Sequence, residues 1–249
     1  MEPHTKPPSW RAAPIVIAGV GAGLGAALAR RFARGGCRVV MLARSLENLE
    51  RIRSAEPVEI AEKLTLHACD LGNGDAIGAT FTRIREALGP VGGLIYNASE
   101  AGFRSLADTT PELFERAWRT TTLGALRCLQ ACVEDLAKFP GAPVLLTGAT
   151  SAVRGRKGAV AFSSAKFALR GFAQASAQEL GHRGIHLAHL IVDGVIDESG
   201  LPPSDIGPEE DPLMRPDDIA ESYWMVAHQP PSAWSLELDL RPRSEGIFE

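Results

Sequence analysis

Short apolar runs rich in β-branched residues alternate along the chain with longer segments of mixed polarity that suit helices. The expected strands are residues 15–18, 38–42, 64–68, 93–96, 143–146, 185–192 and 234–240. The expected helices are residues 23–34, a charged segment from 45 onward, 75–88, 111–139, 159–180 and 217–227. Because alternating strands and helices connect by right-handed crossovers, this order predicts a parallel sheet with helices on both faces. The sequence therefore predicts an α/β fold built on a doubly wound, parallel seven-stranded sheet.

Two segments lie outside this alternation. Residues 1–14 are polar and proline-rich, and we expect a flexible arm there, followed by a single domain over residues 15–249. Residues 194–216 are rich in proline, glycine and acidic side chains. Because a helix and a strand still follow them, we expect a loop or a mobile lid. In the last strand, leucines alternate with acidic residues, which predicts one buried face and one solvated face.

The composition is that of one ordinary globular domain. At 249 residues with 45% hydrophobic side chains, the chain is long enough to bury one substantial core. The net charge of −4 and the 22% of charged residues describe a mixed surface, without a basic stripe of the kind that binds nucleic acid. No stretch is apolar enough to span a bilayer or to form the core of a signal peptide. We therefore expect a cytoplasmic protein with no nucleic-acid or membrane partner.

Neither the cysteines nor the histidines indicate a metal site. The four cysteines are Cys37, Cys69, Cys128 and Cys132, and their spacing fits no zinc motif. Cys128 and Cys132 would share one helix face, which allows a metal or redox pair, although buried thiols are the simpler interpretation. His186 and His189 lie on one expected strand at a spacing that points them to opposite faces. We predict no metal.

A glycine-rich segment, residues 18–25, lies where the first strand ends and the first helix begins. Glycine there permits a tight turn, close approach of the backbone to a pyrophosphate, and close packing of helix on strand. The positive end of the helix then faces the phosphates. The residues expected to contact a dinucleotide are Gly19, Gly21, Gly23, Leu24 and Gly25. The alternative is a glycine-rich turn that holds no ligand.

Three features together carry a resemblance to one family. The spacing Gly-x-x-x-Gly-x-Gly starts at Gly19, Asn97 closes the fourth strand, and Lys166 follows an aromatic residue by four positions. Over about residues 15–241 the chain resembles a short-chain dehydrogenase/reductase. The resemblance implies a Rossmann fold, a nicotinamide dinucleotide, a small-molecule substrate, and a homodimer or homotetramer built on the two long helices and the last strand.

The same resemblance implies which residues bind the cofactor. NAD-selective members place an acid just after the second strand, whereas this chain has Ala43 followed by Arg44. A cation with no neighbouring acid favours the 2′-phosphate of NADP over NAD, although Arg44 could also be a solvated surface residue. The remaining residues implied to contact the cofactor are Asp70, Leu71, Asn97, Lys166, Gly194 and Ile196. Asn97 could serve only to brace the sheet.

The catalytic positions implied by the resemblance have lost their usual side chains. Phe162 stands where the family has the tyrosine that donates or accepts a proton, and a phenyl ring cannot transfer one. Ala149 stands at the serine position, and Thr121 at that of an asparagine which supports a relay water. Lys166 is retained, with an implied role in holding the nicotinamide ribose. Ala149, Phe162 and Ser99 are expected to line the substrate pocket.

Three side chains could supply part of the missing chemistry. Ser151 lies so close to Ala149 in sequence that a small shift of register would bring its hydroxyl toward a substrate carbonyl. Lys166 would lie beside the cofactor. Asp193 follows the sixth strand, where ligands of such folds bind, although it could instead cap the next helix. Tyr223 is a more distant candidate.

The missing groups limit the reactions that we expect. General acid–base help is typically worth about 10²–10⁴-fold in rate, so ordinary ketone reduction without it should be slow. A protonated imine or an activated alkene needs less help. We therefore predict an NADP-dependent oxidoreductase that transfers hydride to or from a small organic substrate at an atypical site. The alternatives are a dinucleotide-binding isomerase or dehydratase, and a nucleotide-binding protein without catalysis.

Overall fold

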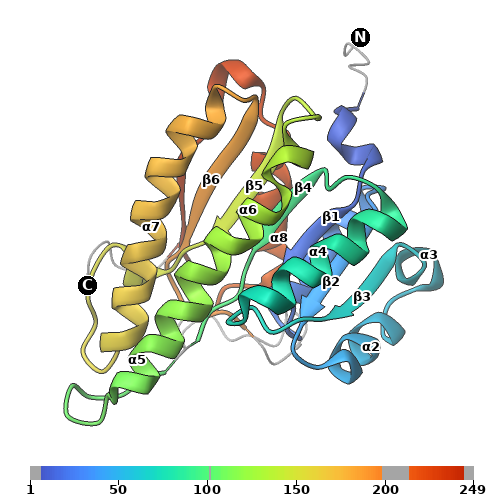
Figure 1. The fold of residues 1–249 in the computed structure, drawn as a ribbon. Coiled ribbons are helices and arrows are strands. Elements are labelled where there is room, and N and C mark those ends of the chain that lie inside the picture. The colour runs from blue at the N-terminus through green and yellow to red at the C-terminus, as the bar shows by residue number, and fades with distance from the viewer. Residues whose placement is uncertain (1–6, 101, 198–212, 244–249) are drawn as a thin grey trace.

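A sheet of seven parallel strands runs through the molecule, in the order β3-β2-β1-β4-β5-β6-β7 (Figure 1). The structure, a computed structural model, describes residues 7–100, 102–197 and 213–243. The strands are β1 (Ile15–Ala18), β2 (Val39–Ala43), β3 (Leu64–Ala68), β4 (Gly93–Tyr96), β5 (Ala142–Thr147), β6 (Ile185–Val192) and β7 (Glu237–Leu240). The order runs outward in both directions from β1 and β4, which confirms the predicted doubly wound sheet.

Helices cover both faces of this sheet. They are α1 (Leu24–Arg34), α2 (Leu46–Ser54), α3 (Val58–Ala61), α4 (Gly74–Leu88), α5 (Pro111–Trp118), α6 (Gly124–Leu136), α7 (Val160–Gly181) and α8 (Pro216–Ala227). In Figure 1, α4, α6 and α7 lie in front of the sheet, and α8 lies behind it, where it packs against α1. The four-residue helix α3 has no counterpart among the elements expected from the sequence.

Capping residues explain where several helices begin. The Ser45 hydroxyl accepts a hydrogen bond from a backbone amide of the first turn of α2, and the Asn73 side chain does the same for α4. Thr110 caps α5, whose first residue is Pro111, a residue pre-organised for the first helical turn. These starts agree with the sequence-based boundaries to within one residue.

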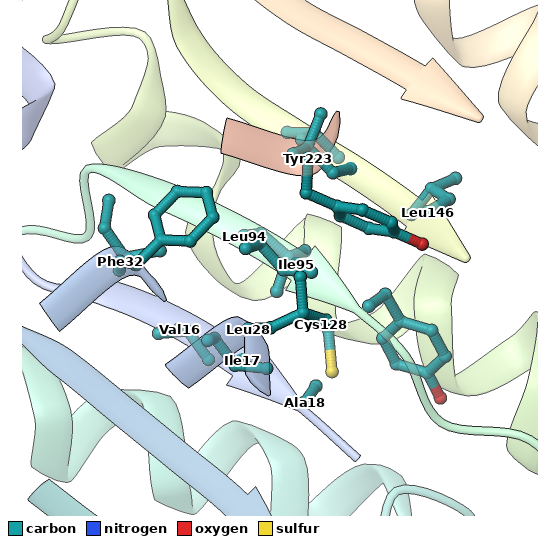
Figure 2. Packing of buried hydrophobic residues seen from close by; sticks show 14 of the residues in the cluster. Val16, Ile17, Ala18, Leu28, Phe32, Leu94, Ile95, Cys128, Leu146 and Tyr223 are labelled. Carbon is teal, nitrogen blue, oxygen red and sulfur yellow. The ribbon is translucent and has the colours of Figure 1, made fainter. Parts of the chain in front are cut away.

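Apolar side chains from both helical layers meet on the central strands. Every residue of β1, β4, β5 and β6 is buried, as expected for parallel strands covered on both faces. Figure 2 shows part of this cluster, in which the labelled residues are Val16, Ile17, Ala18, Leu28, Phe32, Leu94, Ile95, Cys128, Leu146 and Tyr223. All of these are fully buried and come from β1, α1, β4, α6, β5 and α8. The core therefore fixes the ends of the central strands, from which the site is built.

The helix expected over residues 111–139 is interrupted between α5 and α6 by a π-helical turn, Arg119–Leu123. The hydroxyl of Tyr96 donates a hydrogen bond to the carbonyl of Thr120. The hydroxyl of Thr122 donates to a backbone carbonyl of α7, at 2.8 Å. Both bonds tie the wide turn to neighbouring elements, and such long-range contacts leave no trace in the local hydrophobic pattern.

The expectation of a flexible arm is wrong for the last part of residues 1–14. Residues 1–6 lie outside the described residues, but Ser9–Ala12 form a short 3-10 helix. Trp10 within it is only 1% exposed, and its ring packs edge-on against His228 at 5.0 Å between ring centres. A single large apolar side chain thus anchors a segment that its polar neighbours make look unstructured.

The C-terminal part of the domain also differs from expectation. β7 begins at Glu237, because a 3-10 turn at Pro231–Ala233 precedes it, and Leu236 is left exposed outside the strand. Residues 198–212, most of the expected lid, lie outside the described residues. Just beside them, Ile196 forms a parallel bridge with Met214. Within the part of the chain that the structure describes, no helix has both the length and the apolarity to cross a bilayer.

Replacing Trp10 by alanine should lower the free energy of unfolding by about 3–5 kcal/mol, because a fully buried indole leaves a cavity behind. Urea denaturation followed by circular dichroism measures the loss. Leu106→Ala is the control, because Leu106 is 78% exposed and its removal should cost about 1 kcal/mol or less. Equal losses at the two positions would show that the N-terminal turn contributes nothing to the core.

Candidate cofactor site and active site

A cleft of about 700 Å³ opens at the carboxyl ends of β1, β2, β4 and β5. Thirteen of the residues predicted for the site line it: Gly19, Gly21, Gly23, Leu24, Gly25, Arg44, Asp70, Leu71, Asn97, Ser99, Ala149, Phe162 and Lys166. The four that do not line it are Ser151, Asp193, Gly194 and Ile196. The sheet therefore gathers the residues expected to contact the dinucleotide, apart from Gly194 and Ile196, but it does not gather Ser151 or Asp193, which were expected to replace the lost acid.

The glycine loop has the shape that a bound pyrophosphate requires. Gly19 has φ +93°, and a Cβ there would lie 2.4 Å from the amide nitrogen of Ala98. A Cβ on Gly25 would lie 2.7 Å from the Cα of Val20, so the start of α1 packs directly on the loop. A Cβ on Gly21 would meet nothing within 4 Å and would occupy cleft space instead. The residues present thus fit a dinucleotide whose phosphates approach the backbone at Gly21.

Asn97 holds this loop in place. Its side-chain amide donates a hydrogen bond of 2.9 Å to the carbonyl of Gly19, across the gap between β1 and β4. On the other side, the amide of Gly19 donates to the carbonyl of Leu42 at the end of β2. The bracing role implied by the resemblance is therefore present, and Asn97 also lines the cleft.

One end of the cleft lies over β2 and β3. Arg44 follows β2 there and is exposed, and Ala43 supplies no acid beside it. Asp70, just past β3, uses one carboxylate oxygen to accept a hydrogen bond from the amide of Gly72, at 2.9 Å. Leu71 next to it is buried. This end offers a cation, a turn-stabilising carboxylate and an apolar wall, which suits the adenosine half of a dinucleotide.

Lys166 lies at the other end, on the second turn of α7. Its side chain is 2% exposed, and its ammonium donates a hydrogen bond of 2.7 Å to the carbonyl of Thr147 at the end of β5. Among the described residues, no carboxylate lies within ion-pair distance of it. Burial without a countercharge lowers the pKa of Lys166 to about 7. The hydrogen bond to Thr147 holds Lys166 at the cleft, and its ammonium loses its proton near neutral pH.

Phe162 forms an apolar wall one helical turn before Lys166. The centre of its ring lies 5.6 Å from the Lys166 ammonium and 5.4 Å from the ring of Phe103. A parallel bridge between Arg104 and Ala159 ties the loop that carries Phe103 to the start of α7. Position 162 thus presents aromatic surface to the cleft and no proton donor.

The structure does not bring the hydroxyl of Ser151 to the cleft. Ala149 is extended and lines the cleft, and the chain then enters a 3-10 turn, Thr150–Ala152, whose side chains are buried. The hydroxyl of Thr150 donates a hydrogen bond to the carboxylate of Asp193. The expected shift of register is therefore wrong, because the tight turn buries Ser151 away from the cleft lining and the hydroxyl of Thr150 is bonded to Asp193.

Asp193 is neither a helix cap nor a cleft residue. Its carboxylate is 2% exposed and lies 3.6 Å from the guanidinium of Arg154 and 3.4 Å from that of Arg241. A Cβ on Gly194 would lie 2.9 Å from both Met214 and Pro242, so its close approach is to these residues. Gly194 and Ile196 are half-buried after β6 and do not line the cleft, so their predicted contacts with a cofactor stay predictions.

Two other candidate groups also lie behind the cleft wall. Thr121 is fully buried in the π-helical turn, and its hydroxyl has no hydrogen-bond partner within the described part of the chain. Tyr223 of α8 donates a hydrogen bond of 2.8 Å to the hydroxyl of Thr147, and burial raises the pKa of this tyrosine. Thr120, which the sequence reasoning passed over, lines the cleft in place of Thr121.

The cysteines and histidines serve the core. Cys128 and Cys132 are buried free thiols whose pKa is raised by burial. His186 stacks on Trp234, whereas His189 lies 3.7 Å from a carboxylate oxygen of Glu237, so the two rings have separate surroundings. Among the described residues, no group of three or more potential ligands could hold a metal ion.

The profile of the short chain dehydrogenase family matches residues 13–199. The chain belongs to this family. The D-xylose 1-dehydrogenase of Caulobacter vibrioides is 31% identical over 191 residues, which cover 76% of this chain and 74% of that protein. A short-chain dehydrogenase structure from Rhodopseudomonas palustris is 28% identical, with a TM-score of 0.77 over 93% of this chain and 99% of that one. A metagenomic short-chain oxidoreductase solved in complex with NADP is 24% identical, with a TM-score of 0.77 over 93% and 97%.

Sequence reasoning missed several residues that line the cleft. Asn48 and Arg51 extend the Arg44 end along α2, and their spacing of three on a helix was the available signal. Glu100 lines the opposite end and lies 3.4 Å from Arg116. Its position directly after Ser99 could have identified it, because the loops after parallel strands carry the ligands of such folds.

Lys166→Met should stabilise the protein in its cofactor-free form, and the gain should shrink as pH rises. The unfolded chain keeps the lysine protonated to about pH 10.5, whereas the folded protein releases this proton near pH 7. Below pH 7 the folded state buries a charged ammonium at full cost, and between pH 7 and 10.5 that cost declines. The decline spans at most about 5 kcal/mol.

Urea denaturation at a series of pH values from 6 to 9 measures this difference. Lys157→Met is the matched control, because Lys157 is exposed and its replacement should change stability little at any pH. A stability offset for Lys166→Met that stays constant across the series would contradict a lowered pKa.

Proposed function

We propose that the protein is an NADP-dependent oxidoreductase that transfers hydride to or from a small organic substrate at a site without the usual tyrosine. One observation carries the proposal, namely the single cleft that runs from Arg44 past the glycine loop to Lys166 and Phe162. A dinucleotide extended along it would bring its phosphates to the start of α1 and its redox ring to the end beside Lys166.

The choice of NADP rests on the charge at the β2 end of the cleft. Arg44 lines that end, and Ala43 replaces the acid that would repel a 2′-phosphate. The metagenomic relative solved with NADP is in line with this choice. NAD would lose the contact with Arg44 but could still use the glycine loop, so we expect weaker binding of NAD rather than none.

The chain's own residues would bind and orient the cofactor. Backbone amides at the start of α1 would take the pyrophosphate, and Lys166 would donate from its fixed position to the ribose hydroxyls of the nicotinamide half. A reduced nicotinamide supplies a hydride when bound. Phe162 and Ala149 would shield the reacting carbon from water with apolar surface, and neither can move a proton.

The substrate class follows from the apolar side chains of Phe162 and Ala149, which offer no proton beside the reacting carbon. A protonated imine fits, because hydride adds to its carbon while the π electrons move onto nitrogen, and no further proton is required. An activated alkene also fits, because its proton can arrive from water after hydride transfer. An unactivated ketone fits poorly, since its developing alkoxide would face Phe162, and acid catalysis is worth about 10²–10⁴-fold.

A second candidate function is nucleotide binding without redox chemistry, either as an isomerase or dehydratase or as a non-catalytic partner. One observation favours it: Thr150, Asp193 and Tyr223 do not line the cleft, and their polar groups are bonded to one another or to Thr147 in the cleft wall. The two candidates share cofactor binding and differ only in whether the nicotinamide changes its oxidation state.

We also propose that the protein acts as a homodimer or homotetramer in the cytoplasm. Phe114 and Trp118 of α5 and Phe167 of α7 are exposed apolar side chains on two helices that pack side by side, which supports a contact with a second copy. The four cysteines are free thiols, in keeping with a reducing compartment. Light scattering of the purified chain measures the oligomer.

The proposed function predicts a preference in binding and a preference in turnover. NADPH should raise the melting temperature more than NADH does. Purified protein with NADPH should then reduce a cyclic imine or an enone faster than a simple ketone. A separate assay with D-xylose and NADP⁺ tests the substrate that the name of the Caulobacter relative gives. The absorbance of the reduced nicotinamide follows each reaction.

Phe162→Tyr should raise ketone reduction by about 10²-fold or more, because it restores a phenol beside Lys166. Phe162→Leu is the control, since it changes the ring without adding a hydroxyl. NADPH binding with no turnover by either the wild type or Phe162→Tyr would favour the second candidate. Absence of NADPH and NADH binding would refute both.

A further inference from the structure

A second arginine lines the same end of the cleft as Arg44. Arg51 lies on the second turn of α2 and is exposed, and Asn48 lines the cleft between the two arginines in the chain. Arg44 approaches from the end of β2, whereas Arg51 approaches from the helix. The cleft therefore carries two guanidinium groups that reach it from different elements.

The position of Arg51 is fixed by a chain of hydrogen bonds. Its guanidinium donates to the side-chain oxygen of Asn48, at 2.8 Å. The backbone amide of Asn48 donates in turn to the hydroxyl of Ser45, the residue that caps α2, at 3.1 Å. The helix cap thus holds Asn48, and Asn48 holds Arg51. This arrangement reduces the side-chain freedom that Arg51 would lose on binding an anion.

Neither Arg44 nor Arg51 forms an ion pair with an acidic side chain of the described residues. Glu50 pairs with Arg53 at 2.6 Å, and neither of these residues lines the cleft. Among the described residues, no carboxylate lies within ion-pair distance of Arg44 or Arg51. The one acid that lines this end, Asp70, accepts a backbone hydrogen bond within its own turn. The end therefore carries an excess of positive charge that suits a dianion.

We propose that Arg51 is a second anchor for the 2′-phosphate of the cofactor, and that Asn48 is a positioning residue which acts through Arg51. The proposal rests on the proposed function, because it assigns a specificity-determining residue to the same site. A phosphate monoester offers three oxygens, enough for one guanidinium from β2 and another from α2. A cofactor with a free 2′-hydroxyl gains almost nothing from Arg51.

Calorimetric titration of the full chain tests this directly, with two matched pairs of ligands. NADPH and NADH differ by the 2′-phosphate, and so do adenosine 2′,5′-bisphosphate and adenosine 5′-monophosphate, which need no nicotinamide end. Arg51→Ala should weaken NADPH and the bisphosphate about tenfold and leave the other two within about twofold. Added salt should weaken NADPH binding less in this variant than in the wild type.

Three control variants separate recognition from structure. Arg53→Ala removes an arginine of the same helix that does not line the cleft, and it should leave all four affinities unchanged. Arg51→Lys should recover only part of the lost affinity, because an ammonium lacks the planar fork of a guanidinium. Asn48→Ala should weaken NADPH binding about threefold in the wild type and have no effect in the Arg51→Ala background, as a residue acting through Arg51 must.

The outcomes are distinct. Equal weakening of NADPH and NADH by Arg51→Ala, or an equal effect of Arg53→Ala, would overturn the role of Arg51 and leave the NADP proposal standing. If the wild type binds NADPH and NADH equally, the NADP preference itself fails and Arg51 loses its ligand. A loss confined to the two ligands that carry a 2′-phosphate supports both.

Discussion

The hydrogen bond from the Asn97 side chain to the carbonyl of Gly19 is the interaction on which the cleft depends. β1 and β4 are neighbours in the sheet, but the chain leaves β1 toward β2 and leaves β4 toward β5, so the loops after them part at their carboxyl ends. Asn97 spans this gap at 2.9 Å, and the missing side chain of Gly19 permits the approach, since a Cβ there would lie 2.4 Å from the amide nitrogen of Ala98. Gly19 also has a positive φ, which other residues rarely adopt. The spacing of the two loops therefore depends on the backbone at Gly19 and on the side-chain amide of Asn97.

Burial has opposite consequences at the two ends of that cleft. At the α2 end the basic side chains are exposed, so their charge is fully available to a ligand that arrives from water. At the α7 end Lys166 is buried and has only the carbonyl of Thr147 to accept a hydrogen bond, so its charge is costly. A tyrosine at position 162 would offer a second partner, and Phe162 does not. A bound ribose would therefore satisfy the ammonium in a way that the protein alone cannot.

The sequence predicted the fold and the cofactor track because both depend on local signals. Apolar runs located all seven strands, and Gly19, Arg44 and Lys166 lie in the cleft as their neighbours in sequence implied. The expectations for Ser151 and Asp193 were wrong because each depends on where a turn directs a side chain, which a 3-10 turn and a buried ion pair decide. Trp10 and the π-helical turn escaped notice for the same reason, since contacts distant in sequence hold both in place.

The hydroxyl groups of Thr150 and Tyr223 lie near the Lys166 end of the cleft, but both are engaged in hydrogen bonds within the protein. The hydroxyl of Thr150 is bonded to Asp193, and that of Tyr223 to Thr147, so each hydrogen bond satisfies a buried group at the expense of the cleft. Recruiting either one for catalysis would leave its partner buried and unsatisfied, at about 1–3 kcal/mol. The protein therefore offers neither of these hydroxyls to a molecule in the cleft, and any proton transferred there has to come from the cleft lining, from water or from the bound molecule itself.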